Sequence, residues 1–309
     1  MFNKLNIKTL AIIFGVLVLI VALTQWLKSS GNDRNFRESL VEVDTAKITS
    51  ITIIPKGQKE PMVLKKTAQQ WDLLYKNKTY HTDHGPVNAI LKSLTELRPE
   101  RLAATGEESR EQYEVGESSG TRVKVEESGK TTAAFIIGKV SYQQNYQSMN
   151  TFIRLENEQD IYAVSGFQVM NFNQDLNSLR FKALGKGSYD KISRITFSYP
   201  DSSFTLTLNG KIWNVNGMPA DSLNVYNYLQ MITNAIGSSF ADDATPLKQP
   251  VYSVLVESDA KNVMEIKAFP ADSTNMFYVT STANPGAVFS ENRDGLIKNL
   301  FVPQKHFRK

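Results

Sequence analysis

The chain has 309 residues, 41% of them hydrophobic and 21% charged, which suits about two globular domains with sizeable cores. It contains no cysteine, and this excludes disulfide bonds, thiolate chemistry and a lipid anchor on an N-terminal cysteine. Of the 35 basic and 31 acidic residues, three basic and no acidic residues fall within the first 28 positions. The remaining body is therefore almost neutral and gives no support for nucleic-acid binding, which needs a clustered basic face.

The first 28 residues are predicted to form a membrane anchor. The stretch from Thr9 to Leu27 contains 19 residues without a charge, and about 20 apolar residues are needed to cross the hydrocarbon core. Lys4 and Lys8 precede it, so the N-terminus is expected in the cytoplasm and the body outside it. The alternative is a cleaved signal peptide, but no Ala-x-Ala site follows and the apolar run is longer than a usual signal core. We expect a single-pass protein of the cytoplasmic (inner) membrane.

A polar stretch at residues 29–46 is interpreted as a tether between the anchor and the folded body. The alternating, β-branched run KITSITIIP at residues 47–55 then predicts the first strand. The same apolar spacing recurs in KISRITFSY at residues 191–199, 144 residues later. The chain is therefore predicted to repeat itself.

Both copies continue alike. A short second strand, PMVLKK or SFTLTLNG, is followed by a strand that begins at Trp71 in WDLLY and at Trp213 in WNVNG. We interpret both tryptophans as core residues that close a sheet against a helix. An aspartate follows in each copy, and Asp83 and Asp221 are predicted helix N-caps because a carboxylate accepts hydrogen bonds from the free amides of the first turn.

The two predicted helices have the same apolar register. Apolar residues at i, i+3, i+4, i+7 and i+10 give one stripe on an amphipathic helix. In the first copy these are Val87, Ile90, Leu91, Leu94 and Leu97, and in the second they are Val225, Tyr228, Leu229, Ile232 and Ala235. Pro99 is expected to end the first helix and Gly237 the second.

Further strands follow each helix, and a short helical stretch closes each copy. The first copy offers YEV, TRVKVEE, TTAAFIIG, TFIRL and IYAV, and the second offers VYSVLVES, NVMEIKAF, MFYVTS and AVFS. Adjacent strands with short turns imply antiparallel sheets, so the expected class is α+β. We predict a transmembrane helix followed by two tandem modules at residues 47–184 and 185–309, joined by a linker in ALGKGSYD at 183–190.

The order of these signals resembles the bacterial domain of unknown function 4340 family. The matching stretches are ITSITI, WDLL, GPVNAILKSLTEL, QYEVGE, FIIGK, NTFIRL and DIYAVSGF…LNSLRFKAL, and the resemblance covers residues 47–309 in two copies. The second copy departs from the pattern because it lacks the IIGK turn. The resemblance implies a membrane-anchored, extracytoplasmic partner of an ABC-2-type, gliding-motility-like exporter. It implies no catalytic residue.

The sequence contains no pattern of reactive side chains that predicts an enzyme. His81 and His84 flank Asp83, but two ligands do not specify a zinc site, and solvated histidines beside a helix cap are the better interpretation. The sequence contains no nucleophile elbow, phosphate-binding lysine loop or cofactor fingerprint. We therefore predict no catalytic residue, no cofactor and no metal.

One polar loop at residues 141–150, SYQQNYQSMN, is a candidate partner-binding segment. Tyrosines combine ring area with a polar tip, as recognition loops often do. The residues in question are Tyr142, Gln143, Asn145 and Tyr146. A plain exposed hairpin is the simpler interpretation of the same residues, because long polar connections are common on surfaces.

The sequence favours two functions, and a third class, a hydrolase with a scattered site, stays open although no feature points to it. The first is a non-catalytic accessory protein that docks on an ABC-type permease, an auxiliary membrane protein or another envelope assembly. The second is a module that binds an envelope glycan or small ligand between its two repeats, since domain interfaces often hold pockets. The core of the repeats is predicted to include Trp71, Leu91, Leu94, Trp213, Leu229 and Ile232.

Overall fold

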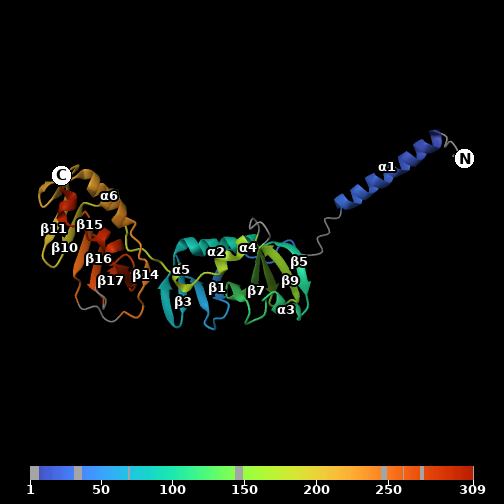
Figure 1. Ribbon diagram of the computed structural model, residues 1–309, viewed down its shortest axis with the longest axis horizontal. Helices are drawn as coiled ribbons and strands as arrows, with labels where there is room; N and C mark the ends of the chain where they lie inside the picture. Colours follow the sequence, from blue (N-terminus) through green and yellow to red (C-terminus); the bar gives the residue numbers. More distant parts are fainter. Residues whose placement is uncertain are drawn as a thin grey trace. The chain divides into compact units, whose positions relative to one another are not determined.

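A computed structural model of the chain consists mainly of β-structure with two long helices in its folded body (Figure 1). The structure describes residues 7–30, 37–68, 70–142, 149–244, 249–259, 261–271 and 275–308, and within the first of these ranges it describes side chains for 13–24. All structural statements below concern these residues.

Two antiparallel nine-stranded sheets form the body. The first has the order β4 (Lys78–His81), β3 (Trp71–Tyr75), β2 (Met62–Lys66), β1 (Ile48–Ile54), β6 (Thr121–Glu127), β7 (Lys130–Tyr142), β8 (Met149–Leu155), β9 (Asp160–Ser165) and β5 (Pro99–Thr105). The second has the order β13 (Met218–Pro219), β12 (Ile212–Val215), β11 (Ser203–Asn209), β10 (Arg194–Ser198), β15 (Tyr252–Ser258), β16 (Lys261–Pro270), β17 (Met276–Ser281), β18 (Phe289–Asn292) and β14 (Ser239–Phe240). Strand for strand, the two orders are the same. The α+β class and the two sheet modules are confirmed.

The two long helices, α2 and α6, occupy corresponding places between the strands. The α-helices are α1 (Ile7–Ser30), α2 (His84–Glu96), α3 (Ser109–Gln112), α4 (Gly166–Val169), α5 (Leu176–Leu179), α6 (Ser222–Thr233) and α7 (Lys298–Leu300). Shorter helical turns are η1 (Met170–Phe172), η2 (Tyr189–Lys191), η3 (Arg293–Ile297) and η4 (Gln304–Phe307). In each sheet the long helix follows the fourth strand in the chain, and Figure 1 shows α6 lying along the second sheet.

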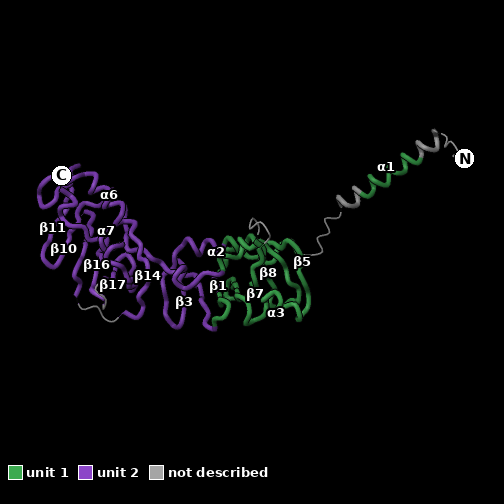
Figure 2. Tube along the Cα trace, in the orientation of Figure 1, with its two compact units in different colours: residues 1–48, 53–58, 92–172 green, residues 49–52, 59–91, 173–309 purple. Residues whose placement is uncertain are grey.

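Close contacts divide the chain into two compact units (Figure 2). Unit 1 comprises residues 1–48, 53–58 and 92–172, and unit 2 comprises 49–52, 59–91 and 173–309. The division passes through the first sheet, whereas the whole second sheet belongs to unit 2.

The register repeats as well as the strand order. Trp71 pairs with Lys66 across β2 and β3, and Trp213 pairs with Leu208 at the same place across β11 and β12. Both sheets also have a register shift at the same strand pair, after Val125 in β6 and after Val256 in β15. Because such a bulge is a local feature of one strand, its recurrence fixes which residues of the two sheets are equivalent.

Both long helices bury the predicted stripe. Val87, Ile90, Leu94 and Leu97 are fully buried, as are Val225 and Ile232, while Tyr228, Leu229 and Ala235 are at most 5% exposed. Leu91 is half-buried. The predicted caps are confirmed, because Asp221 accepts hydrogen bonds from the amides of Leu223 and Asn224 and Asp83 accepts one from Gly85.

The second core is rich in aromatic rings. Phe197 stacks on Phe204 with centroids 4.3 Å apart, and Phe307 packs beside both. Tyr228 on α6 donates a hydrogen bond from its hydroxyl to the Leu300 carbonyl at 2.8 Å. This bond satisfies a polar group that would otherwise be buried without a partner, and it ties the long helix to the closing helical stretch.

The two segments that the sequence suggested were connectors contain buried residues that pack against the folded body. Residues 37–46 of the predicted tether pack into unit 1, where Leu40 and Val41 are 5% and 4% exposed. In the predicted linker, Leu184 is fully buried, and a Cβ on Gly185 would lie 2.3 Å from the Ile232 carbonyl oxygen. Both segments therefore contribute buried residues to the folded body. Their polar neighbours in the sequence made them look like exposed connectors.

Two local expectations were wrong. The predicted strand YEV is a turn that follows α3, in which Glu114 has a φ of 57°. The predicted turn IIGK lies inside β7, and a Cβ on Gly138 would lie 2.1 Å from the Tyr113 carbonyl oxygen. Because Gly138 has no side chain, the turn at residues 113–115 can pack directly against β7. There the amide of Lys139 donates a hydrogen bond to the Tyr113 carbonyl. Strand β5 was not predicted at all.

The apolar N-terminal segment is helical from Ile7 to Ser30. From Ile13 to Thr24, where its side chains are described, every residue is exposed, including Phe14 at 70%. Within the described part of the chain, no helix has both the length and the apolar character required to cross a membrane.

Candidate functional site

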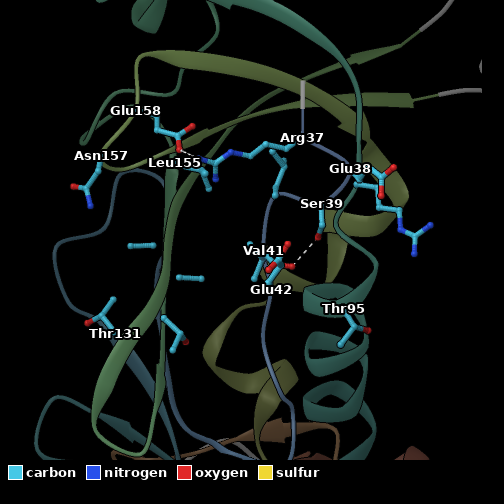
Figure 3. Close-up of a pocket in the computed structure, with 15 residues that line it drawn as sticks. Arg37, Glu38, Ser39, Val41, Glu42, Thr95, Thr131, Leu155, Asn157 and Glu158 are labelled. Carbon is cyan, nitrogen blue, oxygen red and sulfur yellow. Dashed lines mark hydrogen bonds and ion pairs between the residues drawn. The ribbon is translucent and has the colours of Figure 1, made fainter. Parts of the chain in front are cut away.

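A large groove in unit 1 is the candidate functional site (Figure 3). Its volume is about 1150 Å³, and the residues that line it come from four segments. These are residues 37–42, the end of α2 with the residues after it, the first half of β7, and the turn between β8 and β9.

One wall is the extended segment 37–42. Leu40 donates from its amide to the Leu97 carbonyl at 3.1 Å, so the segment is attached to the end of α2. Ser39 donates from its hydroxyl to the Val41 carbonyl at 2.8 Å, and Figure 3 shows this bond within the wall. The guanidinium of Arg37 crosses the gap and pairs with Glu158 on the opposite side.

A buried arginine shapes the opposite wall. Arg154 in β8 is 3% exposed and donates hydrogen bonds to the carbonyls of Val115, Leu155, Glu156 and Glu158 at 3.0 to 3.2 Å. Burial lowers the pKa of its guanidinium, and the nearby Arg110 lowers it further. Carbonyl dipoles replace the lost hydration, so Arg154 fixes the turn that carries the groove residues Asn157 and Glu158.

The lining is polar, with an apolar floor. Half-buried Ala133, Ala134 and Leu155 form the floor, and hydroxyl groups come from Ser39, Thr95, Thr131 and Thr132. The charged lining residues are Arg37, Arg98, Glu38, Glu42 and Glu158. Two guanidinium groups and three carboxylates leave one net negative charge. The groove can therefore donate and accept many hydrogen bonds.

A second pocket, of about 420 Å³, lies in unit 2 around Arg180. This side chain is 4% exposed and forms two hydrogen bonds of 2.7 Å with the carboxylate of Asp242. Its guanidinium carbon lies 4.1 Å from the ring centre of Tyr80 and 3.5 Å from that of Phe240. An arginine stacked between two rings and paired bidentately is a rigid, well-compensated cation.

The predicted partner-binding loop lies mostly outside the described residues. Tyr142 is the last residue of β7 and is 63% exposed, while Gln143, Asn145 and Tyr146 are among the residues that the structure leaves undescribed. The predicted core residues fall on the expected elements. Trp71 is 7% exposed, Leu94 and Ile232 are fully buried, Leu229 is 4% exposed, and Trp213 is half-buried against the second core.

The histidines do not converge. His81 ends β4 with its Nδ1 3.6 Å from Asp72 Oδ1, and His84 begins α2 as an exposed residue. In the part of the chain that the structure describes, no three His, Cys, Asp or Glu side chains are grouped so that they could hold a metal ion.

The strongest pKa shifts belong to structural tyrosines. Burial raises the pKa of the Tyr228 hydroxyl well above its ordinary value and also raises that of Tyr199. Both hydroxyls donate to main-chain carbonyls, Tyr228 to Leu300 and Tyr199 to Val302. Both hydroxyls therefore stay protonated and neutral, and their hydrogen bonds tie the core together.

Residues 71–250 match the model of a protein family, Domain of unknown function (DUF4340), which covers more than half of the chain. The chain belongs to this family. No curated protein and no solved structure matches it. The DUF4340 match begins at Trp71 in β3 and ends before β15, so it includes parts of both sheets.

Sequence reasoning missed the groove. Its residues are alanines, threonines and charged side chains that carry no motif, and its outer wall lies in the predicted tether. The available signal was indirect: apolar Leu40 and Val41 stand together in an otherwise polar stretch. These two side chains are the buried residues by which the segment packs into unit 1.

Proposed function

We propose that the chain is a non-catalytic, membrane-anchored accessory protein whose body lies outside the cytoplasm and docks on an ABC-type exporter or another envelope assembly. In this proposal the two sheets are tandem copies of one domain. The observation that supports it is that the chain has both the apolar helix α1 and a folded body with a large groove lined by polar and charged residues. The groove offers hydrogen bonds and charge to a partner.

The exposed apolar side chains of α1 support the membrane anchor. Between Ile13 and Leu23 of α1 every residue is apolar, and the large side chains of Phe14, Leu17, Leu19 and Val21 are 54% or more exposed. Such a surface is unfavourable in water, at roughly 25 cal/mol for each Å² of apolar area. The uncharged stretch from Thr9 to Leu27 extends beyond the side chains that the structure describes and is long enough to span a bilayer.

The test is purification of the tagged full-length chain from membranes. We expect it to stay in the membrane fraction after washing at high salt and high pH, and to copurify with an ABC-type permease or an auxiliary membrane protein. Reporter fusions at the two ends should place the N-terminus in the cytoplasm and the C-terminus outside it. Release by the alkaline wash, or recovery without any transporter or envelope component, would contradict the proposal.

An alternative function is a glycan or small-ligand binding module with a site between the two repeats. The Arg180 pocket favours it, because its lining combines β4 of the first sheet with Phe240 and Asp242 at β14 of the second. Thermal shifts of the full chain with a panel of envelope oligosaccharides would test this function. A shift that Arg180→Lys abolishes would support it, and no shift with any oligosaccharide would argue against it.

A further inference from the structure

The groove of the first sheet has a counterpart in the second sheet, and the register shows which residues correspond. Next to the shared bulge, Val125 pairs with Ala133 in the first sheet and Val256 pairs with Met264 in the second. On the next strand, the amide of Glu156 donates to Ala134 and that of Thr282 donates to Glu265, each at 3.0 Å. Ala133 therefore corresponds to Met264, and Leu155 to Ser281.

The segments that cover these positions also correspond. Leu40 donates from its amide to Leu97 just after α2, and Leu184 donates to Ala235 just after α6. Leu97 and Ala235 lie 14 residues after the capping aspartates Asp83 and Asp221. Residues 37–42 are thus equivalent to residues 181–186.

In the second sheet this segment is bound closely through its main chain. Asn284 donates from its side chain to the Phe181 carbonyl at 2.7 Å, and Ser281 donates from its hydroxyl to the Leu184 carbonyl at 2.6 Å. The amide of Lys186 contacts Met264 Sδ at 3.1 Å. Gly185 lets the backbone approach the end of α6, and Met264, 1% exposed, fills the remaining space.

In the first sheet each of these contacts is changed. Glu158, the counterpart of Asn284, reaches the segment only through the long side chain of Arg37. The side chains of Leu155 and Ala133 have no group that could hydrogen-bond to the segment, and the side chain of Ala133 is shorter than that of Met264 at the corresponding position. Val41 stands where the second sheet has Gly185, so the segment cannot come as close to its helix. The result is the open groove of about 1150 Å³.

We infer that this groove binds an extended peptide segment of a partner protein, with a basic residue in that segment. The second sheet shows that an extended backbone is what the same surface accepts. The volume exceeds the roughly 300–1,000 Å³ of most small-molecule pockets and suits a chain several residues long. Hydroxyl groups on both walls can bond to a peptide backbone.

The ligand class follows from the charges and from the lack of rings. With Arg37 paired to Glu158, the other charged lining residues are Glu38, Glu42 and Arg98, which favours a cationic side chain. The described residues that line the groove include no aromatic ring. Sugars are usually stacked on aromatic rings, so a peptide fits these walls better than a glycan does. The inference rests on the proposed function, because it names where a protein partner docks.

The test places a photo-crosslinking amino acid at Thr131 in the full-length chain, in the cells that make it. The matched control carries it at Asn262, which the register makes the counterpart of Thr131 in the second sheet. We expect crosslinks from position 131 to one segment of one extracytoplasmic protein, and none to that segment from 262. Ala133→Met, which introduces the second sheet's side chain, should reduce the yield at least fivefold.

The crosslinked segment, made as a synthetic peptide, should then bind the purified full-length chain. We expect the Kd to rise at least tenfold in Ala133→Met. A second variant, Glu38→Lys with Glu42→Lys, changes two exposed side chains and keeps the test valid if the methionine impairs folding. It should weaken this peptide and strengthen a version with its basic residue changed to glutamate.

Three results would overturn the inference: crosslinks from 131 to lipid or glycan alone, equal crosslinks from 262, or peptide binding unaffected by both variants. Copurification separates this failure from that of the proposed function. If the permease or auxiliary protein still copurifies while position 131 yields no peptide, only the groove is excluded. If no partner copurifies and no peptide is crosslinked, both proposals fail.

Discussion

The two sheets share strand order, register and bulge, yet they close over their covering segments in different ways. The second sheet uses Asn284 and Ser281 to bond main-chain carbonyls directly. In the first sheet, the segment and the opposite turn are joined instead by the ion pair between the side chains of Arg37 and Glu158. The same strand order and register can therefore carry a filled surface in one sheet and an open one in the other, depending on a few side-chain lengths.

Tryptophan substitutions test whether the two sheets depend equally on equivalent positions. Trp71 is 7% exposed, and Trp213 is only half-buried although its register is the same. Trp71→Ala should lower the free energy of unfolding by about 3–5 kcal/mol, the usual cost of emptying a core aromatic site. Trp213→Ala should cost about half as much because less surface leaves the core. Urea unfolding followed by circular dichroism measures both, and equal costs would show that burial does not distinguish the sheets.

The core and caps could be predicted from sequence because they are local. The stripe from Val87 to Leu97 and the aspartates Asp83 and Asp221 lie within one helix or one turn, where a spacing of three or four residues determines what is buried. The place of β5 beside β9 depends on pairing across more than 50 residues, and nothing in residues 99–105 specifies that partner. The groove depends on the small side chain of Ala133. That this side chain leaves open space is recognised only when it is compared with Met264, which fills the corresponding position in the second sheet.

Arg180 tests whether strands of the two sheets unfold together. Its guanidinium contacts Tyr80 of β4 and Phe240 of β14 and pairs with Asp242. Arg180→Met should cost about 3 kcal/mol, since it leaves a carboxylate without its buried partner. Arg180→Lys should cost less, because an ammonium keeps the charge but not the bidentate geometry. Calorimetry should show one unfolding transition for the parent and two for the methionine variant. A single unchanged transition in the variant would show that Arg180 does not couple the unfolding of the two sheets.

Exchanging the groove residues tests the cause of the difference directly. Met264→Ala should cost about 2–3 kcal/mol, since the methionine is almost fully buried and its removal leaves a cavity. Ala133→Met should change stability by less than about 1 kcal/mol, because the added side chain enters space that is already open. Thermal unfolding of both variants gives the comparison. A loss of 3 kcal/mol or more for Ala133→Met would mean that the groove cannot accept even one side chain.

The smallest expected effect is a difference in acid sensitivity between the N-caps of the helical stretches that close the two sheets. Asp175 caps α5 by accepting from the Ser178 amide at 2.6 Å, and Asn292 caps the second closing stretch by accepting from Asp294. The bond to Ser178 lowers the pKa of Asp175, so its charged form is favoured in the folded state. The stabilisation is complete above the ordinary pKa of an aspartate, near 4, and is lost as the pH falls through the lower folded value. The neutral cap at Asn292 has no such dependence.

Amide hydrogen exchange between pH 6 and pH 3, corrected for intrinsic rates, reads out both caps in one sample. Protection of Ser178 should fall below about pH 4 while that of Asp294 stays constant. Asp175→Asn gives the first sheet the amide cap of the second, and it should remove this acid sensitivity without altering Asp294. If Ser178 loses protection equally in the asparagine variant, the acid response comes from elsewhere in unit 2, because a residue that cannot titrate cannot carry it.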